Sequence, residues 1–425
     1  MRFSTVATAL AVGRSAMAAP APHKDHDSWG HDHKIAPKVM IVSLFSPEAD
    51  IWYEKLPSSG LGDLLDVNIT APGLSMLFPH VHCVADHSIC QMTTGESEIN
   101  AASTVMAVAL SGKFDLTKTY FMIGGIAGIN PKYGTLGSVA LAQYTVQVAL
   151  QYEFDAREMP ANWSTGYFGY GTEEPNVYPG NAYGTEVFEL SATLRDMAYD
   201  FASKANLSVD ATAEAYGKKF AAAKQASLYT PATQPPSVIK CDTATSDVYY
   251  SGNILGEAFE EVTKVWTNGT GKYCMTAQED SAVLEVLVRL AIDGLVDVSR
   301  AILMRTGSDF DRPPPDETAF DNLRVADQNG FSIAIDNIYL AGVEIVRGIL
   351  DGWHTTFRKG VEPENYIGDI FGSLGGKPDF GPGSTTNGTG YKPHGRSGDE
   401  MRRRAVSSGM GRKAGFAKRT AVGRK

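Results

Sequence analysis

Residues 119–129 read TYFMIGGIAGI, an apolar run of strand length that ends in glycines. A continuous apolar run of this length is typical of a strand that is buried on both faces of a sheet. Residues 38–46, KVMIVSLFS, repeat the pattern and end at Pro47, after which residues 48–56 have the pattern of a helix. The two runs predict the central strands of a sheet.

Around these strands the chain alternates between helix and strand patterns. We expect a hairpin at 81–93 and one or two strands within 137–154, with further strands at 238–250 and 272–277. Helices are expected at 96–111, 186–205, 211–226, 253–266 and 280–304, and a helix pair at 330–358. The aromatic, Gly-rich and Pro-rich stretch 155–185 predicts a long loop. Such alternation indicates an α/β fold with helices on both faces of a sheet.

The two ends of the chain differ in composition from its body. Residues 1–18 have a positive start, an apolar stretch at 3–12 and an A-x-A site at 16–18, which predicts a signal peptide. Residues 19–37 form a polar leader, residues 38–376 the folded domain, and residues 377–425 a disordered basic tail. Residues 396–425 carry ten Lys or Arg against two acidic residues, so the total of −10 leaves −18 for residues 1–395. An acidic body argues against nucleic-acid binding.

Several features point to a secreted or cell-surface protein. N-x-[ST] sequons begin at Asn68, Asn162, Asn206, Asn268 and Asn387. The four cysteines allow three pairings, and the hairpin makes a Cys83–Cys90 disulfide feasible. The sequence has no C-x-x-C motif, so we expect no structural zinc site. We also expect no other metal site and no cofactor. The best internal apolar stretch, 281–304, carries charges every three or four residues, so we expect no membrane span after the N-terminus.

Four segments together resemble the fungal purine nucleoside permease family: MIGGIAGI (122–129), VYYSGNILGEAF (248–259), GKYCMTAQEDSAVLEVL (271–287) and RTGSDFDRPP (305–314). They are remotely similar to the purine nucleoside phosphorylases and the methylthioadenosine/S-adenosylhomocysteine nucleosidases. The resemblance implies a three-layer αβα domain with a central mixed sheet. It also implies a purine nucleoside site at the carboxyl ends of the strands.

Asp309 is the residue to which the resemblance assigns the role of general acid. In the wider group, a Ser-Asp pair at a strand end places an acid beside purine N7, and Ser308-Asp309 follow the strand-like run 301–305. A purine anion leaves poorly, so protonation lowers the barrier. An N-cap is the alternative role for this pair, because Ser and Asp favour that position.

Two glutamates complete the implied site. Gln278-Glu279 stand where the group has a Met-Glu pair whose carboxylate binds ribose hydroxyls. Glu48 stands shortly after the first strand, where the nucleosidases have a Glu that orients the attacking water. The alternative for both glutamates is a favourable charge in the first turn of a helix.

Aromatic and glycine residues are implied in ligand contact. Tyr249 would stack on the purine base, and the backbone amides of Gly124 and Gly125 would approach the ligand closely. The phosphorylases often carry an Arg before the glycine strand end and a Ser after it, whereas this chain has neither, which favours water as the nucleophile. Residues 93–103 resemble the group's Gly-x-Gly-x-x-Asn-Ala-Ala helix entry, with Ser97 in place of the second glycine.

Three functions fit these observations. The first is a hydrolase that releases a purine base outside the cell, using Asp309, Glu48 and Glu279. The second is a nucleoside-binding component of uptake without catalysis, which would require a membrane partner. The third is a non-catalytic storage protein on the same fold. The sequence leaves a homo-oligomer open in each case.

Overall fold

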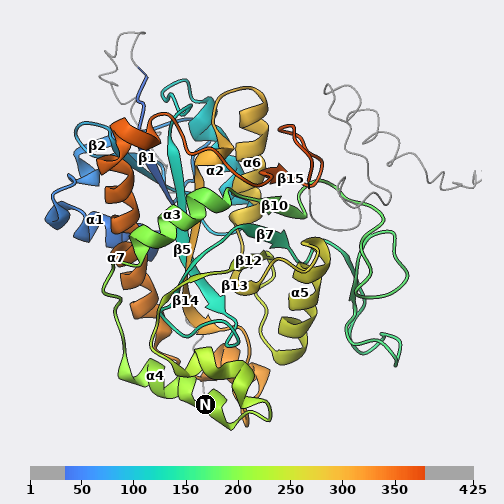
Figure 1. Ribbon diagram of the computed structural model, residues 1–425. Coiled ribbons are helices and arrows are strands. Elements are labelled where there is room, and N and C mark those ends of the chain that lie inside the picture. The colour runs from blue at the N-terminus through green and yellow to red at the C-terminus, as the bar shows by residue number, and fades with distance from the viewer. Residues whose placement is uncertain (1–33, 379–425) are drawn as a thin grey trace, which may run out of the picture. The chain divides into compact units, whose positions relative to one another are not determined.

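The computed structural model describes residues 34–378, and a mixed β-sheet runs through the centre of this part (Figure 1). Its strands are β1 (Val39–Ser43), β2 (Val67–Ile69), β3 (Val81–Cys83), β4 (Ile89–Thr93), β5 (Tyr120–Ile129), β6 (Val139–Leu141), β7 (Tyr144–Gln147), β10 (Val187–Glu189), β11 (Val238–Lys240), β12 (Asp242–Thr245), β13 (Tyr273–Ala277), β14 (Ala301–Phe310) and β15 (Gly368–Asp369). Their main order is β15-β10-β7-β12-β13-β5-β1-β4-β3-β2, and β14 joins β5 and β6 while β11 joins β6. The expected signal peptide, most of the leader, most of the basic tail and the sequon at Asn387 lie outside the described residues.

Strand β5 holds the centre of the sheet, and the central strands expected from the sequence are confirmed as β1 and β5. The residues of β5 are buried almost throughout, and β5 pairs in parallel with β1 on one side and with β14 on the other. Parallel pairing brings the carboxyl ends of β1, β5 and β14 to the same edge of the sheet. That edge is where open α/β sheets bind ligands.

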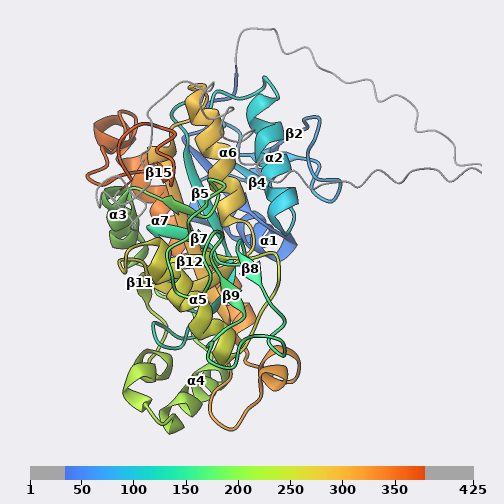
Figure 2. The same ribbon diagram turned by 90° about the vertical axis from the view of Figure 1, so that its right-hand side faces the viewer.

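Helices cover the sheet on both faces. Successive side chains of a strand point to opposite faces. Accordingly, Ile41 and Met122 pack in one core with α1 (Ser46–Lys55), α3 (Ala192–Ala202) and α7 (Gly330–Asp351). Their neighbours Val42 and Ile123 pack in another with α2 (Glu98–Leu110) and α6 (Asp280–Ile292). The expected three-layer αβα arrangement with a central mixed sheet is confirmed (Figures 1 and 2).

Two further elements lie beside this core. Helix α5 (Asn253–Trp266) packs against β13, and helix α4 (Ala211–Lys218) leads into 3₁₀ turns. The expected loop 155–185 is largely irregular, but it contributes β9 (Tyr167–Phe168), which pairs with β8 (Tyr152–Glu153) in a separate ribbon. Figure 2 shows this ribbon beside α5, where the rings of Tyr167 and Phe259 lie 5.0 Å apart.

Several expected boundaries were wrong. The helix expected at 280–304 ends at Ile292, because Gly294 takes a positive φ of 70° and residues 301–310 join the sheet as β14. The expected helix at 186–205 begins at Ala192, since residues 187–189 form β10, and the helix expected at 211–226 ends at Lys218. The expected strand at 238–250 is two strands and ends at Thr245, while residues 137–154 hold β6, β7 and β8. The expected helix pair at 330–358 is one helix, α7, followed by a π turn at Trp353–Phe357.

The cysteines form two disulfides. Cys83 and Cys90 face each other across the β3–β4 hairpin, as expected, and Cys241 joins Cys274 between the starts of β12 and β13. Within residues 34–378, no helix combines the length and the apolar character needed to cross a bilayer.

Candidate functional site

A cavity of about 430 Å³ opens at the sheet edge where β1, β5 and β14 end. Segments that are distant in sequence supply its walls: the β1–α1 junction, the ends of β5 and β13, the β12–α5 loop, β14 and the start of α7. Six of the eight predicted site residues line this cavity, namely Glu48, Tyr249, Gln278, Glu279, Ser308 and Asp309. The fold therefore gathers into one site residues that are spread over more than 260 positions of the chain.

Glu48 lies in the first turn of α1, and its carboxylate is held by the backbone of two strand ends. The side chain is 1% exposed. Oε2 accepts a hydrogen bond from the Leu44 amide at 2.8 Å, and Oε1 accepts one from the Ile126 amide at 2.7 Å. Burial raises the pKa of Glu48 to about 8, although the nearby Arg305 guanidinium opposes this shift. A carboxyl group with this pKa can gain or lose a proton close to neutral pH, which acid–base chemistry requires.

Arg305, which the sequence analysis did not select, ties the acidic residues of the site together. The side chain is 2% exposed and comes from β14. Its Nη2 lies 3.0 Å from Glu279 Oε2, its Nε lies 3.1 Å from Asp280 Oδ1, and its Nη1 donates to the Ile126 carbonyl at 3.0 Å. An arginine inside the apolar strand run AILMRTG was the signal in the sequence, because a buried charge needs partners.

Glu279 reaches the cavity from the start of α6 and is held from two directions. Oε2 pairs with Arg305, and Oε1 accepts a hydrogen bond from the Ser97 amide at 2.9 Å. Ser97 has φ 82° and ψ 157°, a conformation that is nearly exclusive to glycine. Ser97, which stands in place of the second glycine of the helix-entry motif, therefore presents its N–H to Glu279.

Gln278 lies beside Glu279 and connects two walls of the cavity. Its Nε2 donates to the backbone carbonyl of Asp247 at 3.0 Å. Asp247 in turn accepts a hydrogen bond from the Glu98 amide at 2.9 Å. These contacts hold the β12–α5 loop against the starts of α2 and α6.

Asp309 faces the cavity from a bulge in β14. The pairing of β14 with β5 shifts register between Gly307 and Asp309, so two residues of β14 span one step of its partner. Ser308 Oγ donates to Asp309 Oδ1 at 2.7 Å, and the Tyr249 hydroxyl donates to Oδ2 at 3.0 Å. Burial raises the pKa of Asp309 while the two hydroxyl donors lower it, and the net direction is upward. The pair lies within a strand, so the alternative of an N-cap does not apply.

Gly124 and Gly125 do not line the cavity; Ile126, Ala127 and Gly128 line it instead. The strand end expected at Gly124-Gly125 was misplaced, because β5 stays paired with β14 as far as Ile129. Gly125 lies under the acidic cluster: a Cβ there would lie 2.5 Å from Glu48 Oε1 and 2.7 Å from Arg305 Nη1. The absence of a side chain at Gly125 is therefore what lets Glu48 and Arg305 approach the strand.

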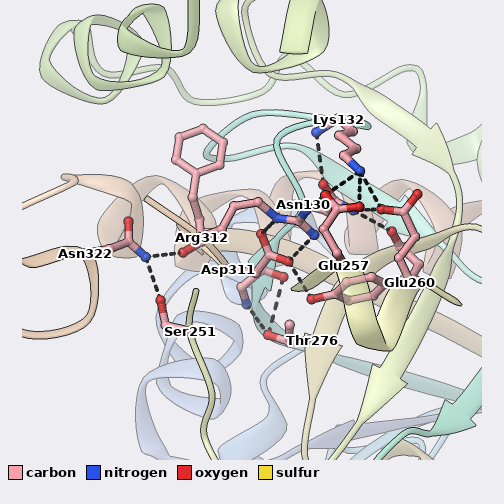
Figure 3. A network of polar contacts seen from close by, with 12 residues as sticks. Asn130, Lys132, Ser251, Glu257, Glu260, Thr276, Asp311, Arg312 and Asn322 are labelled. Atoms are coloured by element: carbon pink, nitrogen blue, oxygen red, sulfur yellow. Dashed lines mark hydrogen bonds and ion pairs between the residues drawn. The ribbon is translucent and has the colours of Figure 1, made fainter. Parts of the chain in front are cut away.

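A buried ion network is built on Asp311 and Arg312, which follow Asp309 in the chain by two and three residues (Figure 3). Arg312 is completely buried. Its Nε lies 2.9 Å from Asp311 Oδ1, and its Nη2 lies 2.9 Å from Asp311 Oδ2. Its Nη1 lies 2.6 Å from Glu257 Oε1, and Tyr273 donates to Asp311 at 2.6 Å. Removing one member of a buried pair is costly. The network therefore fixes the chain two residues beyond Asp309.

The charged groups that line the cavity are mostly acidic. Five carboxyl groups, those of Glu48, Glu96, Glu279, Asp309 and Asp327, face one arginine, Arg305. That arginine already pairs with Glu279 and Asp280. Such a lining favours a neutral ligand that develops positive charge over an anion.

Comparison with known proteins identifies relatives over most of the chain. A family model described as purine nucleoside permease (NUP) matches residues 36–362. A Candida albicans protein named purine nucleoside permease is 44% identical over 383 residues, which cover 87% of this chain and 91% of that protein. A Schizosaccharomyces pombe protein named "Probable purine nucleoside permease C285.05" is 42% identical over 327 residues, which cover 75% and 90%.

Solved structures similar to this chain include two kinds of nucleoside hydrolase. One is a 5′-methylthioadenosine/S-adenosylhomocysteine nucleosidase from Streptococcus pneumoniae with a transition-state inhibitor, at 13% identity and a TM-score of 0.41, covering 73% of this chain and 97% of that one. Another is futalosine hydrolase of Helicobacter pylori, at 13% identity and a TM-score of 0.43, covering 74% and 97%.

Proposed function

Because the chain belongs to the purine nucleoside permease family, we propose that its cavity binds a purine nucleoside and hydrolyses the N-glycosidic bond to free base and ribose. The observation that carries the proposal is the meeting of Glu48, Glu279 and Asp309 in one cavity from three separate segments. Two of these carboxyl groups have raised pKa values through burial. Perturbed carboxyl groups that share a cavity are typical of acid–base sites.

In the proposed reaction each carboxyl group has a separate task. Asp309 donates its proton to N7 of the base as the C1′–N9 bond breaks, and the bonding electron pair leaves with the purine. Water oxygen bonds to C1′ and its proton passes to Glu48. Glu279 accepts hydrogen bonds from the ribose hydroxyls and stabilises the positive charge that develops at C1′. Arg305 holds Glu279 in place and offsets part of the negative charge.

Water fits this site better than phosphate as the nucleophile. Besides Glu48 and Asp309, whose raised pKa values favour the neutral form, three more carboxyl groups line the cavity and disfavour the entry of an anion. The lining arginine is already paired with two of its acidic neighbours. Phosphorolysis would require cations and amides free to receive a phosphate. We therefore expect base release that does not depend on phosphate.

The test is to incubate the purified protein with inosine, guanosine and adenosine, with and without phosphate, and to resolve the products chromatographically. Free base and ribose in equal amounts without phosphate are the expected products. Asp309→Asn should lower turnover by about 10²–10⁴-fold while leaving nucleoside binding within a few-fold. Phosphate-dependent release of ribose 1-phosphate would contradict the hydrolytic mechanism.

The family name favours a second candidate, a nucleoside-binding component of uptake that works with a membrane partner. This candidate predicts saturable nucleoside binding with no base released. A strain that lacks the gene would then import labelled adenosine more slowly. Normal import in that strain, together with hydrolysis by the purified protein, would exclude the uptake function and support hydrolysis.

We also propose that the protein is secreted or lies at the cell surface. Disulfides persist in oxidising compartments, and both cysteine pairs are bridged. The asparagines of the four described sequons, Asn68, Asn162, Asn206 and Asn268, are all exposed. Glycosidase treatment of the protein recovered from culture medium should reduce its mass. Recovery from the cytosol with free thiols would refute the assignment.

A further inference from the structure

Tyr249 has a polar contact that stacking on a base does not require. Its side chain is 60% exposed on the segment 246–252, which joins β12 to α5. The hydroxyl nevertheless donates to Asp309 Oδ2 at 3.0 Å, while Ser308 donates to Oδ1 at 2.7 Å. Each oxygen of the proposed acid thus receives one hydroxyl donor.

The segment that carries Tyr249 is fixed at both of its ends. The Ser246 amide donates to the Ala277 carbonyl at 2.9 Å, and the Gly252 amide donates to the Asp311 carbonyl at 2.8 Å. Asn322 donates to the Ser251 hydroxyl at 2.9 Å, as Figure 3 shows. The segment that holds the Tyr249 phenol against Asp309 is therefore anchored at β13 and at Asp311, two residues beyond Asp309.

These contacts matter most after the acid has given up its proton. Transfer to the base leaves a carboxylate in a partly enclosed site, with the Asp311 carboxylate nearby and raising its proton affinity. Two hydroxyl donors stabilise the ionised form of a carboxyl group more than the neutral form. Although the ring is largely exposed, desolvation of the hydroxyl where it meets Asp309, and the charge of Asp309, raise the pKa of Tyr249, so its hydroxyl keeps the proton that it donates.

We propose that Tyr249 is a positioning residue whose hydroxyl holds the Asp309 carboxyl group and stabilises the carboxylate left by proton transfer. The proposal rests on the proposed hydrolysis. It assigns the hydroxyl a role distinct from that of the ring, which remains available for stacking on the base. Phenylalanine at this position would keep the ring and lose the hydroxyl.

The experiment measures kcat, KM and their pH dependence for inosine with the full-length Tyr249→Phe variant. We expect kcat to fall roughly 3- to 10-fold, the equivalent of one hydrogen bond, with KM nearly unchanged. The limb of the pH profile that reports Asp309 should move to higher pH, because a donor that lowers the pKa of Asp309 is gone. Ser308→Ala removes the other donor and should move the same limb in the same direction.

Tyr183→Phe is the matched control, because Tyr183 is 64% exposed in the loop 155–185 and does not line the cavity. It should leave kcat and the pH profile unchanged. An unshifted limb in Tyr249→Phe, or a change in KM alone, would overturn the positioning role while leaving the hydrolysis intact. Absence of base release by the wild-type protein would overturn both proposals.

Discussion

A methyl group added at Gly125 tests whether the acidic cluster is packed as described. The added Cβ would lie 2.5 Å from Glu48 Oε1, 2.7 Å from Arg305 Nη1 and 2.9 Å from Leu44 Cδ1. None of these atoms can move away cheaply, because Glu48 is held by two backbone amides and Arg305 by its acidic partners. Overpacking of this kind costs about 1–3 kcal/mol in the free energy of unfolding.

The neighbouring glycine provides the control. A Cβ at Gly124 points to the opposite face of β5, and its nearest neighbour is the flexible Met304 Cε at 3.6 Å. Gly124→Ala removes conformational freedom from the unfolded chain and should stabilise the protein by about 0.4–1 kcal/mol. The two alanine variants, one position apart, should therefore differ by roughly 1.4–4 kcal/mol in stability.

Urea denaturation followed by circular dichroism, with the disulfides intact, measures this difference. Gly125→Ala should have the lower midpoint with an unchanged slope. The same variant should also lose base release, because displacing Glu48 breaks its hydrogen bonds to Leu44 and Ile126. Equal midpoints for the two variants would refute the close packing of Glu48 and Arg305 on Gly125.

Three further perturbations test the electrostatics of the site. Burial raises the pKa of Glu48 from 4.5 to about 8, so the contribution of Glu48 to the free energy of unfolding is fully present below about pH 4.5 and is lost as pH rises to about 8. Relative to Glu48→Gln, whose amide does not titrate, the wild type should lose a few kcal/mol of unfolding free energy over that range. Urea titrations at several pH values measure this loss, and parallel pH dependences for the two proteins would contradict the shift. Arg305→Met leaves Glu279 and Asp280 buried without their cation and should lower the free energy of unfolding by about 3–5 kcal/mol at pH 7. Thermal unfolding measures this loss, and a value below about 1 kcal/mol would count against the ion cluster. Ser97→Gly relieves a strained φ of 82° and should raise the unfolding free energy by about 1 kcal/mol with activity retained; a loss of stability would show that the serine is not strained there.

The parts of the fold that the sequence predicted well are those with a strong local pattern. The apolar runs of β1 and β5 have the length and continuity of buried strands, and both are confirmed. The boundary between α6 and β14 was missed, because residues 281–304 are rich in apolar side chains on both sides of it and period alone does not separate a helix from a buried strand. The pairing of β14 with β5 decides the matter, and pairing between distant segments leaves no local trace.

The same distinction applies to the site. Glu48, Glu279 and Asp309 were predicted from short motifs, and the structure places all three in one cavity, while their roles remain proposals. Arg305 was missed because its importance comes from partners on α6, which lie 25 and 26 positions away in the chain. Gly125 was predicted to contact the ligand; in the structure it lies against Glu48 and Arg305, where a side chain would meet both.

The charge balance of the cluster explains how three carboxyl groups in one cavity can take different tasks. Glu279 is paired with Arg305 and accepts a hydrogen bond from the Ser97 amide, so its oxygens are fixed in the cavity where the proposal has them meet the sugar hydroxyls. Within residues 34–378 no cation pairs with Asp309, and burial raises the pKa of this carboxyl group. Glu48 is buried beside Arg305 and accepts hydrogen bonds from two backbone amides, and burial raises its pKa to about 8. In the proposed mechanism, Arg305 pairs with Glu279, the proposed sugar binder, and lies beside Glu48, the proposed base, so moving that charge should disturb both tasks together.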